Sequence, residues 1–404
     1  MLNEREKPSS SVLEWQQEAL AKGVESNELA RDDGRQDGPG AEEEAVAPTV
    51  GRLPLPPARW GRPRRPLDLT PTTHEELVTE AEAVLRRLLV TDNYDSVNNF
   101  VSLHDAFERS TEPLYDVYEK YSPPIRAQKH TCVGLGFELI KRWRGLNKQF
   151  PGSAAATALL SCEEAVVDIW SYVSRGESPA AVAAEKEHVM VGVQIRLEGR
   201  VGLLLADPGY HVPRVVTVMA DRAYPHTGWF TQSDEPHCRK EYNYVFSPHN
   251  SSYVEWQERE TRGGDVKCQT SLVFAARPYL DGVHVTERRN LVYNFRSLLS
   301  RDQKGHVRAG LYFPVGGRGK DAQFTLFFDN GNEKRKTKYK FHIFLESECI
   351  PESILEEIEL CNAQMNYTDG ELRNVICKLA KVMANQSFID QMLEINEDIC
   401  RLCL

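Results

Sequence analysis

Three residues of this 404-residue chain have the types and the order of a cysteine-dependent active site. Cys132 lies where an apolar helical pattern begins, His188 begins a run of alternating apolar residues, and Asp207 ends the next run. A thiol, an imidazole and a carboxylate can form a relay in which the carboxylate orients the imidazole and the imidazole moves the thiol proton. The chemistry to expect is nucleophilic attack by a thiolate.

The stretch KHTCVGLGFELIKRW (129–143) places Cys132 at the start of an amphipathic helix that runs to about Trp143, before Gly145. A helix N-terminus offers unpaired N–H groups and a partial positive charge, and both stabilise a thiolate relative to a thiol. Free cysteine is also among the most buried residue types, so a small core residue is the alternative interpretation. We expect the other cysteines to be structural.

The segment HVMVGVQIRLEGRVGLLLAD (188–207) predicts a β-hairpin with Glu198 and Gly199 as its two turn residues. In that register Met190 faces Asp207 across the ladder, and His188 is the diagonal neighbour of Asp207 on the same face. A carboxylate can then reach the imidazole, whereas Cys132 meets His188 only through tertiary packing. The alternative is that His188 merely ends a strand and Asp207 belongs to an ordinary turn.

This order of a Cys at the head of a helix, a His that starts a strand and an Asp that closes the next strand resembles two families. They are the arylamine N-acetyltransferases and the transglutaminase-like proteins, both with a papain-like core. The resemblance covers TCVGLGFELIKRWRGLN and HVMVGVQIRLEGRVGLLLADPGYH. It implies that Cys132 is the nucleophile, that His188 is the general base and acid, and that Asp207 orients the imidazole.

The two families differ in details that this chain mixes. The acetyltransferases carry Arg-Gly-Gly before the cysteine, where this chain has Lys129-His130-Thr131, whereas Gly145 and Asp207-Pro208 agree with the transglutaminase-like version. The resemblance implies acyl transfer to an amine from a thioester such as acetyl-CoA or another acyl-CoA, a cosubstrate rather than a permanently bound cofactor. The alternatives are a transglutaminase-like or papain-like enzyme acting on a protein amine, glutamine or peptide bond, and a non-catalytic interaction protein.

Hydrophobic periodicity divides the chain into a tail, a mixed domain and final helices. Residues 1–50 hold twelve acidic and five basic residues, a net charge of −7, and residues 51–66 hold five arginines and no acid. We expect residues 1–69 to be a disordered charged tail. Thr73 and Glu76 predict a capping box ahead of helices over 70–150, and period-two patterns predict an antiparallel sheet or barrel over 155–346.

Helical patterns return over 351–404, and we expect these helices to pack on the domain formed by residues 70–350. The fold class is therefore α+β, and the resemblance adds a papain-like core.

Three other motifs are weaker candidates for function. The glycines of VGGRGK (315–320), with Gly316, Gly317 and Arg318, could cradle the phosphates of a coenzyme, although a plain glycine loop between strands is the favoured interpretation. The run KRKTKYK (334–340) could bind a phosphate or an acidic partner, but lysines often protect a sheet edge. Cys400 and Cys403 form one CxxC without the second pair of a zinc site, so we predict no metal.

Composition limits the partners and the compartment. No stretch reaches the roughly 18 apolar residues of a membrane helix, and the N-terminus lacks the apolar segment of a signal peptide. The nine scattered cysteines do not suggest a disulfide framework, so we expect the cytoplasm, with the nucleus as a second compartment. A net charge of −10 argues against a nucleic-acid-binding core, and the charged tail is the candidate contact for a protein partner.

Overall fold

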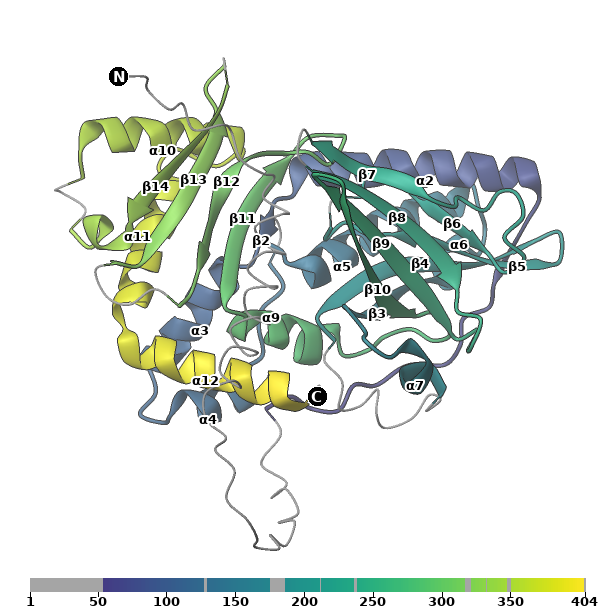
Figure 1. Ribbon diagram of the computed structural model, residues 1–404, viewed down its shortest axis with the longest axis horizontal. Coiled ribbons are helices and arrows are strands. Elements are labelled where there is room, and N and C mark those ends of the chain that lie inside the picture. Colours follow the sequence, from purple (N-terminus) through teal and green to yellow (C-terminus); the bar gives the residue numbers. More distant parts are fainter. Residues whose placement is uncertain are drawn as a thin grey trace, which may run out of the picture.

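The computed structural model describes residues 54–126, 129–174, 186–210, 212–235, 238–316, 321–331, 333–346 and 350–402. Over these residues the chain is a mixed α and β fold with two antiparallel sheets, a larger one and a smaller one, each with its own helices (Figure 1). Among the helices of the described part, none combines the length and the hydropathy needed to cross a membrane.

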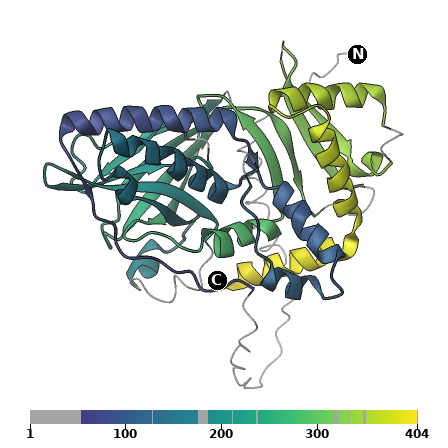
Figure 2. The ribbon, with the colours of Figure 1, turned by 180° about the vertical axis from the view of Figure 1, so that it is seen from behind.

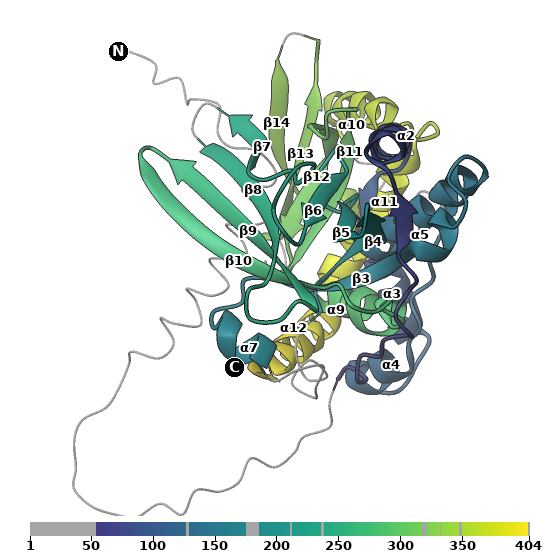
Figure 3. The ribbon, with the colours of Figure 1, turned by 90° about the vertical axis from the view of Figure 1, so that its right-hand side faces the viewer.

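The larger sheet has nine strands in the order β6-β5-β4-β3-β10-β9-β8-β7, with β1 added parallel to β4. Because β6 at one edge also contacts β8, the sheet curls into a half-barrel, and its long strands β8 to β10 extend beyond the helices (Figure 3). Its strands are β1 Leu67–Leu69, β3 Thr157–Glu163, β4 His188–Leu197, β5 Arg200–Ala206, β6 Val216–Met219, β7 Phe230–Glu235, β8 Cys238–Phe246, β9 Tyr253–Arg262 and β10 Asp265–Phe274.

The hairpin of β4 and β5 has the predicted turn and register. Glu198 and Gly199 have φ angles of 48° and 85°, the left-handed values that a two-residue type I′ turn requires. The ladder pairs residue 197 with 200 and residue 191 with 206. His188 and Asp207 are thereby brought to the same end of the hairpin, as predicted.

The smaller sheet has five strands in the order β14-β13-β12-β11-β2. The lysine-rich strand β14 is at its edge, in line with the edge-protecting interpretation. The apolar alternation of KYKFHIFL (338–345) favours a strand over all eight residues, but the strand ends at Lys340, because Phe341 and Phe344 turn into the core on a 3₁₀ helix. Its strands are β2 Tyr94–Asp95, β11 Phe295–Arg301, β12 Val307–Pro314, β13 Gln323–Asp329 and β14 Lys334–Lys340.

Two sets of helices cover the two sheets (Figure 2). Against the larger sheet lie α2 Pro71–Thr91, α5 Cys132–Trp143, η1 Arg144–Lys148 and α6 Ser153–Ala156, with α7 Ile169–Ser174 after β3. With the smaller sheet pack α3 Asn98–Glu108, α4 Leu114–Lys120, η4 Phe341–Phe344, α10 Glu352–Gln364, α11 Glu371–Ala384 and α12 Gln386–Leu402. The π-helix η2 Gly282–Glu287 contacts α5, and α9 Arg288–Val292, which continues it, contacts α12.

The chain passes between these two halves more than once. Helix α2 belongs to the larger half, β2 to α4 belong to the smaller half, and α5 to β10 return to the larger half. Each half has its own buried apolar core, and each fully buried Leu, Ile, Val or Phe contributes about 1.5–3 kcal/mol. Cys132 lies where the chain returns from the smaller half to the larger one, and His188 and Asp207 lie within the larger half.

The ordered chain begins earlier than the predicted boundary at residue 70, and residues 1–53 of the predicted tail lie outside the described residues. Arg59 forms an ion pair with Asp281 at 2.7 Å, and the indole N–H of Trp60 donates to the Ser161 hydroxyl at 3.1 Å. Strand β1 then pairs with β4. The arginines at 59, 62, 64 and 65 are exposed, and the contacts of Arg59 and Trp60 together with the pairing of β1 hold this segment on the domain.

Two predicted helix boundaries also need correction. Thr70 caps α2 and pairs with Thr73 in a reciprocal capping box, in place of the predicted box of Thr73 and Glu76. Pro71 explains the difference, because proline suits the first turn of a helix, where no N–H is required. The last helical pattern is divided at Asn385 into α11 and α12.

Candidate active site

Cys132 is the first residue of α5, as predicted from the sequence, and it is only 2% exposed. Thr131 is the N-cap residue, whose hydroxyl oxygen accepts from the Val133 N–H at 3.3 Å and whose O–H donates to the buried carboxylate of Glu287. A threonine in this position satisfies one free N–H of the first turn. The thiol therefore begins a well-capped helix, where the helix dipole favours negative charge.

His188 and Asp207 form the predicted pair at the open end of the hairpin. The Nε2 atom of His188 is 3.0 Å from both carboxylate oxygens of Asp207, and the two side chains are 3% exposed. Since Nε2 is engaged with Asp207, Nδ1 is the ring nitrogen left for the thiol of Cys132, which also interacts with this imidazole. Tertiary packing thus completes the contact that the sequence alone left open.

The environment of His188 favours the imidazolium form. Burial by itself lowers the pKa of His188, but the Asp207 carboxylate and the Cys132 thiol together raise it by more than burial lowers it. The pKa of His188 is therefore well above its ordinary value. The ring is also held in place by Tyr210, whose ring packs edge-on against it with centroids 4.6 Å apart. An imidazolium between a carboxylate and a thiol is the arrangement that stabilises a thiolate.

Gly209 allows these three side chains to meet. A Cβ atom at this position would lie 2.7 Å from Cε1 of His188, 2.8 Å from Cβ of Cys132 and 3.3 Å from Oδ1 of Asp207. The first two distances are shorter than carbon atoms tolerate, so any larger residue would push the relay apart. The glycine of the Asp-Pro-Gly-Tyr sequence is therefore a packing requirement of the site.

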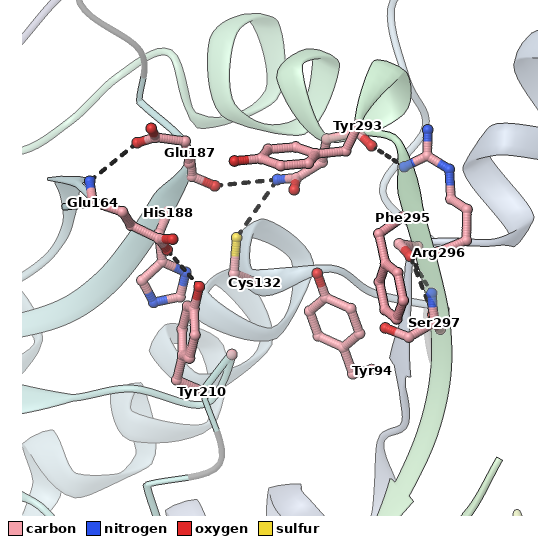
Figure 4. A pocket seen from close by; sticks show the side chains of 13 residues that line it. Tyr94, Cys132, Glu164, Glu187, His188, Tyr210, Tyr293, Phe295, Arg296 and Ser297 are labelled. Carbon is pink, nitrogen blue, oxygen red and sulfur yellow. Dashed lines mark hydrogen bonds between the residues drawn. The ribbon is translucent and has the colours of Figure 1, made fainter. Parts of the chain in front are cut away.

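A cavity of about 80 Å³ lies beside the thiol (Figure 4). Since about 10–15 Å³ of such space is enough for one water molecule, this cavity has room for a group of several heavy atoms. Both halves of the molecule contribute to its walls, because residues of β2 and β11 face the triad. Its lining comprises Tyr94, Ser96, Cys132, Glu164, Glu187, His188, Gly209, Tyr210, Asn290, Tyr293, Phe295, Arg296 and Ser297.

Two glutamates give one wall of the cavity an acidic character. Glu164 accepts a hydrogen bond from the Tyr210 hydroxyl at 2.7 Å, and its backbone N–H donates to the Glu187 carboxylate at 3.2 Å. Burial raises the pKa of Glu164, and burial together with the charges of Glu163 and Glu164 raises the pKa of Glu187 well above its ordinary value. These carboxyl groups can take up or release protons near the reacting atoms.

Asn290 places an amide next to the sulfur. Its Nδ2 atom is 3.8 Å from Sγ of Cys132, 2.9 Å from the carbonyl oxygen of Thr286 and 3.4 Å from that of Glu187. An N–H donor at this place can face an oxygen that develops negative charge on a carbon bonded to the sulfur. Asn290 comes from the short helix α9, 158 residues after Cys132, and the sequence analysis did not identify it.

The sequence analysis did not identify the other cavity residues either. Two of them could have been found, because they are close in sequence to His188 and Asp207. Glu187 precedes His188, and Tyr210 closes the Asp-Pro-Gly-Tyr run, so neighbours of the predicted pair were the residues to examine. Tyr94 and Arg296 carry no comparable signal, because they reach the cavity from β2 and β11 through tertiary structure.

The weaker candidates do not join this site among the described residues. Gly316 is exposed and does not line the cavity, while Gly317, Arg318 and Cys403 lie outside the described residues. No group of three or more His, Cys, Asp or Glu side chains in the described part of the chain is arranged to hold a metal ion. The triad and its cavity are thus the site that the described structure builds.

Comparison with known proteins adds no relative to this geometry: no family model, no curated protein and no solved structure matches the chain.

Proposed function

We propose that this chain is a cysteine-dependent acyltransferase, in which Cys132 takes an acyl group from a thioester such as acetyl-CoA and passes it to an amine. One observation carries the proposal: a buried thiol at a helix N-terminus interacts with an imidazole that a carboxylate holds at 3.0 Å. A core cysteine requires neither of these partners. The expected acyl-CoA is a cosubstrate that arrives and leaves.

The first half-reaction would load the enzyme. The Cys132 thiolate attacks the thioester carbonyl, and the sulfur–carbon bond forms as negative charge moves to the carbonyl oxygen near Asn290. The tetrahedral centre then collapses and expels the thiolate of the donor, which takes the proton held by His188. The products are an acyl-Cys132 thioester and a free thiol such as CoA.

The second half-reaction would unload it. An amine attacks the acyl-Cys132 carbonyl and forms a carbon–nitrogen bond, while the now neutral His188 accepts the amine proton. Collapse of this second tetrahedral centre breaks the carbon–sulfur bond and returns the Cys132 thiolate. Asp207 holds the imidazole through Nε2 and stabilises the imidazolium each time that it forms.

The cavity supports a small acyl group and a basic acceptor. The cavity beside the thiol has room for at least an acetyl-sized group. The carboxyl groups of Glu164 and Glu187, whose pKa values burial raises, can hydrogen-bond to an approaching amine and take up its proton. A small-molecule amine or the amine of a protein lysine fits this description.

A second candidate function is transglutaminase-like transfer, in which the acyl donor is a glutamine side chain. The observation that favours it is Asp207-Pro208, followed by the glycine that packs against both Cys132 and His188. The terminal carboxamide of glutamine is also small enough for the cavity. Both candidates need the same acyl-Cys132 intermediate and differ in the donor and in the leaving group, which is a thiol or ammonia.

The decisive experiment is to trap the acyl-enzyme. The protein is incubated with acetyl-CoA, quenched in acid and digested, and the peptide that contains Cys132 is examined by mass spectrometry for one added acetyl group. A parallel reaction offers a fluorescent alkylamine and a glutamine-containing protein, which detects the transglutaminase-like alternative. The predicted result is an acetyl adduct on Cys132 that disappears when an alkylamine is added.

Cys162 offers a matched control. It is as buried as Cys132 and lies across the β3–β4 ladder from His188, but it is in a strand, where burial raises its pKa well above the ordinary value. Cys162→Ser should keep the adduct and Cys132→Ser should lose it. The absence of an adduct in the wild type, together with no amine incorporation, would exclude both acyl-transfer candidates and leave a papain-like enzyme acting on a peptide bond or a non-catalytic binding protein.

A further inference from the structure

The turn that follows Asp207 is held on two sides. Oδ1 of Asp207 accepts from the backbone N–H of Gly209 at 3.0 Å and from that of Tyr210 at 2.9 Å. Gly209 in turn packs against His188 and Cys132. Because the amides of this turn bind the carboxylate that orients the imidazole, any movement of the turn moves the relay.

The carbonyl groups of the same turn bind a side chain from the other sheet. Arg301 ends β11 of the smaller sheet, and its guanidinium donates to the carbonyl oxygen of Pro208 at 2.7 Å and to that of Gly209 at 3.3 Å. The register of β11 on β12 shifts between Ser300 and Arg301. Such a bulge redirects the following side chain, and here that side chain is directed to the turn.

The charge of Arg301 is buried without a salt bridge. The side chain is 2% exposed, and among the described residues no carboxylate oxygen lies within 4.0 Å of its nitrogens. Its nearest electrostatic partners are the two carbonyls, the Tyr94 ring at 5.8 Å from the guanidinium carbon, and Asp207 at longer range. A buried charge is costly unless hydrogen bonds compensate for it. The two carbonyl oxygens of the turn therefore stabilise the buried guanidinium, and the same hydrogen bonds fix the position of the turn.

From these contacts we propose that Arg301 is a positioning residue for the relay, which acts through the Pro208–Gly209 turn. Its guanidinium fixes the turn from the carbonyl side and keeps Asp207 in contact with His188. The inference rests on the thiolate chemistry of the proposed function. Through Arg301 the smaller sheet positions the residues of the relay, in addition to forming one wall of the cavity.

The test is the rate of Cys132 alkylation by limiting iodoacetamide as a function of pH, read by peptide mass spectrometry in the full chain. Arg301→Met removes the charge and the hydrogen bonds, and Arg301→Lys keeps the charge and loses the planar fork. Thermal unfolding of each variant is measured in parallel. The titratable and charged groups that face the thiol or its cavity are Tyr94, Glu164, Glu187, His188, Asp207, Tyr210, Tyr293 and Arg296, and all are retained in every variant.

Arg288 provides a matched control. It is also a buried arginine that donates to backbone carbonyls, those of Tyr118 and Pro54, and its guanidinium lies over a tyrosine ring at 4.8 Å. It does not line the cavity. Arg288→Met should reduce stability and leave the alkylation profile of Cys132 at its wild-type position.

The expected result is an upward shift of the Arg301→Met profile by about one pH unit and a smaller shift for Arg301→Lys. A folded Arg301→Met protein with the wild-type profile would overturn the inference while leaving the proposed function intact. If Arg301→Met does not fold, an unshifted Arg301→Lys profile overturns it equally. A wild-type Cys132 that reacts no faster than the other cysteines would overturn the proposed function and this inference together.

Discussion

The surroundings of His188 and of His130 are two regions near the N-terminus of α5 that look alike and behave in opposite ways. Both histidines are buried, at 2% and 3% exposure, and both have an aspartate close by. Nε2 of His188 is 3.0 Å from Asp207, and Nε2 of His130 is 3.8 Å from Asp92. Yet the pKa of His188 is raised and the pKa of His130 is lowered.

The difference follows from how each aspartate is shared. Around His130 burial is the dominant effect, and Asp92 is already paired with the guanidinium of Arg142 at 2.5 Å, which itself lowers the histidine's pKa. Around His188 the carboxylate and the thiol together outweigh burial. Of these two buried histidines, the imidazolium form is favoured in the one whose aspartate has no arginine within ion-pair distance among the described residues.

The largest expected effect is the difference in Cys132 alkylation rate between substitution of His188 and substitution of His130. His188→Gln should slow the alkylation of Cys132 by about 100-fold at pH 6.5, because an unassisted thiol ionises only near pH 8.5. His130→Gln should change the rate less than about threefold. Rates come from peptide mass spectrometry after timed exposure to iodoacetamide, and similar slowing by both substitutions would show that the comparison is false.

Substitution of two glycines tests the same comparison, and the expected effects are of intermediate size. Gly209 leaves room for the ring of His188, and Gly134 leaves room for that of His130, whose Cγ would be 2.9 Å from an added Cβ. Gly209→Ala should slow Cys132 alkylation about tenfold, since small displacements of reacting groups are costly. Gly134→Ala should mainly lower the unfolding free energy, by about 1–3 kcal/mol.

Gly145→Ala is the control for both glycine substitutions. A Cβ atom at Gly145 would meet nothing within 4 Å, so its unfolding free energy should stay within about 0.5 kcal/mol of the wild type. Denaturant unfolding and the alkylation assay together distinguish the three variants. A Gly209→Ala protein that loses stability but keeps a fast thiol would show that the close packing of this glycine is not a condition for reactivity.

The smallest expected effect is on the pH dependence of stability. The pKa of His188 is raised on folding, so its contribution is complete below the unfolded pKa of about 6.5 and is lost as the pH rises through the folded pKa. The pKa of His130 is lowered on folding. Its contribution to the free energy of unfolding is therefore complete above the unfolded pKa of about 6.5 and is lost as the pH falls through the folded pKa.

Urea unfolding at pH 5, 6.5 and 8 checks this prediction. The loss of unfolding free energy caused by His188→Gln should be larger at pH 5 than at the highest pH. The loss caused by His130→Gln should be smaller at pH 5 than at pH 8. Trends of the same sign for both variants would mean that the two sites are electrostatically equivalent.

The parts of the site that were predictable are those that local geometry determines. The helix over 132–143 follows from its apolar spacing, and the meeting of His188 with Asp207 follows from a two-residue turn and the period of two along each strand. Neither needs information from outside its own segment. The α+β composition followed in the same way from the periodicities of the separate segments.

What could not be predicted depends on packing between distant segments. The strands β7 to β9 and β11 were not assigned, because their polar and charged residues hide the alternation. Asn290 and Arg301 reach the triad across 158 and 93 residues of chain. Glycine at 209 looked like a turn residue, and only the assembled site shows that its missing side chain is what matters.

The interleaved path of the chain has a consequence for biosynthesis. Arg301 follows Pro208 by 93 residues, so a ribosome completes Cys132, His188 and Asp207 well before it adds the arginine that holds their turn. During that interval the nascent chain lacks β11 and the wall that it forms over the thiol. The candidate site around Cys132 is therefore completed late in translation, once the smaller half, which forms part of its cavity wall, has been synthesised.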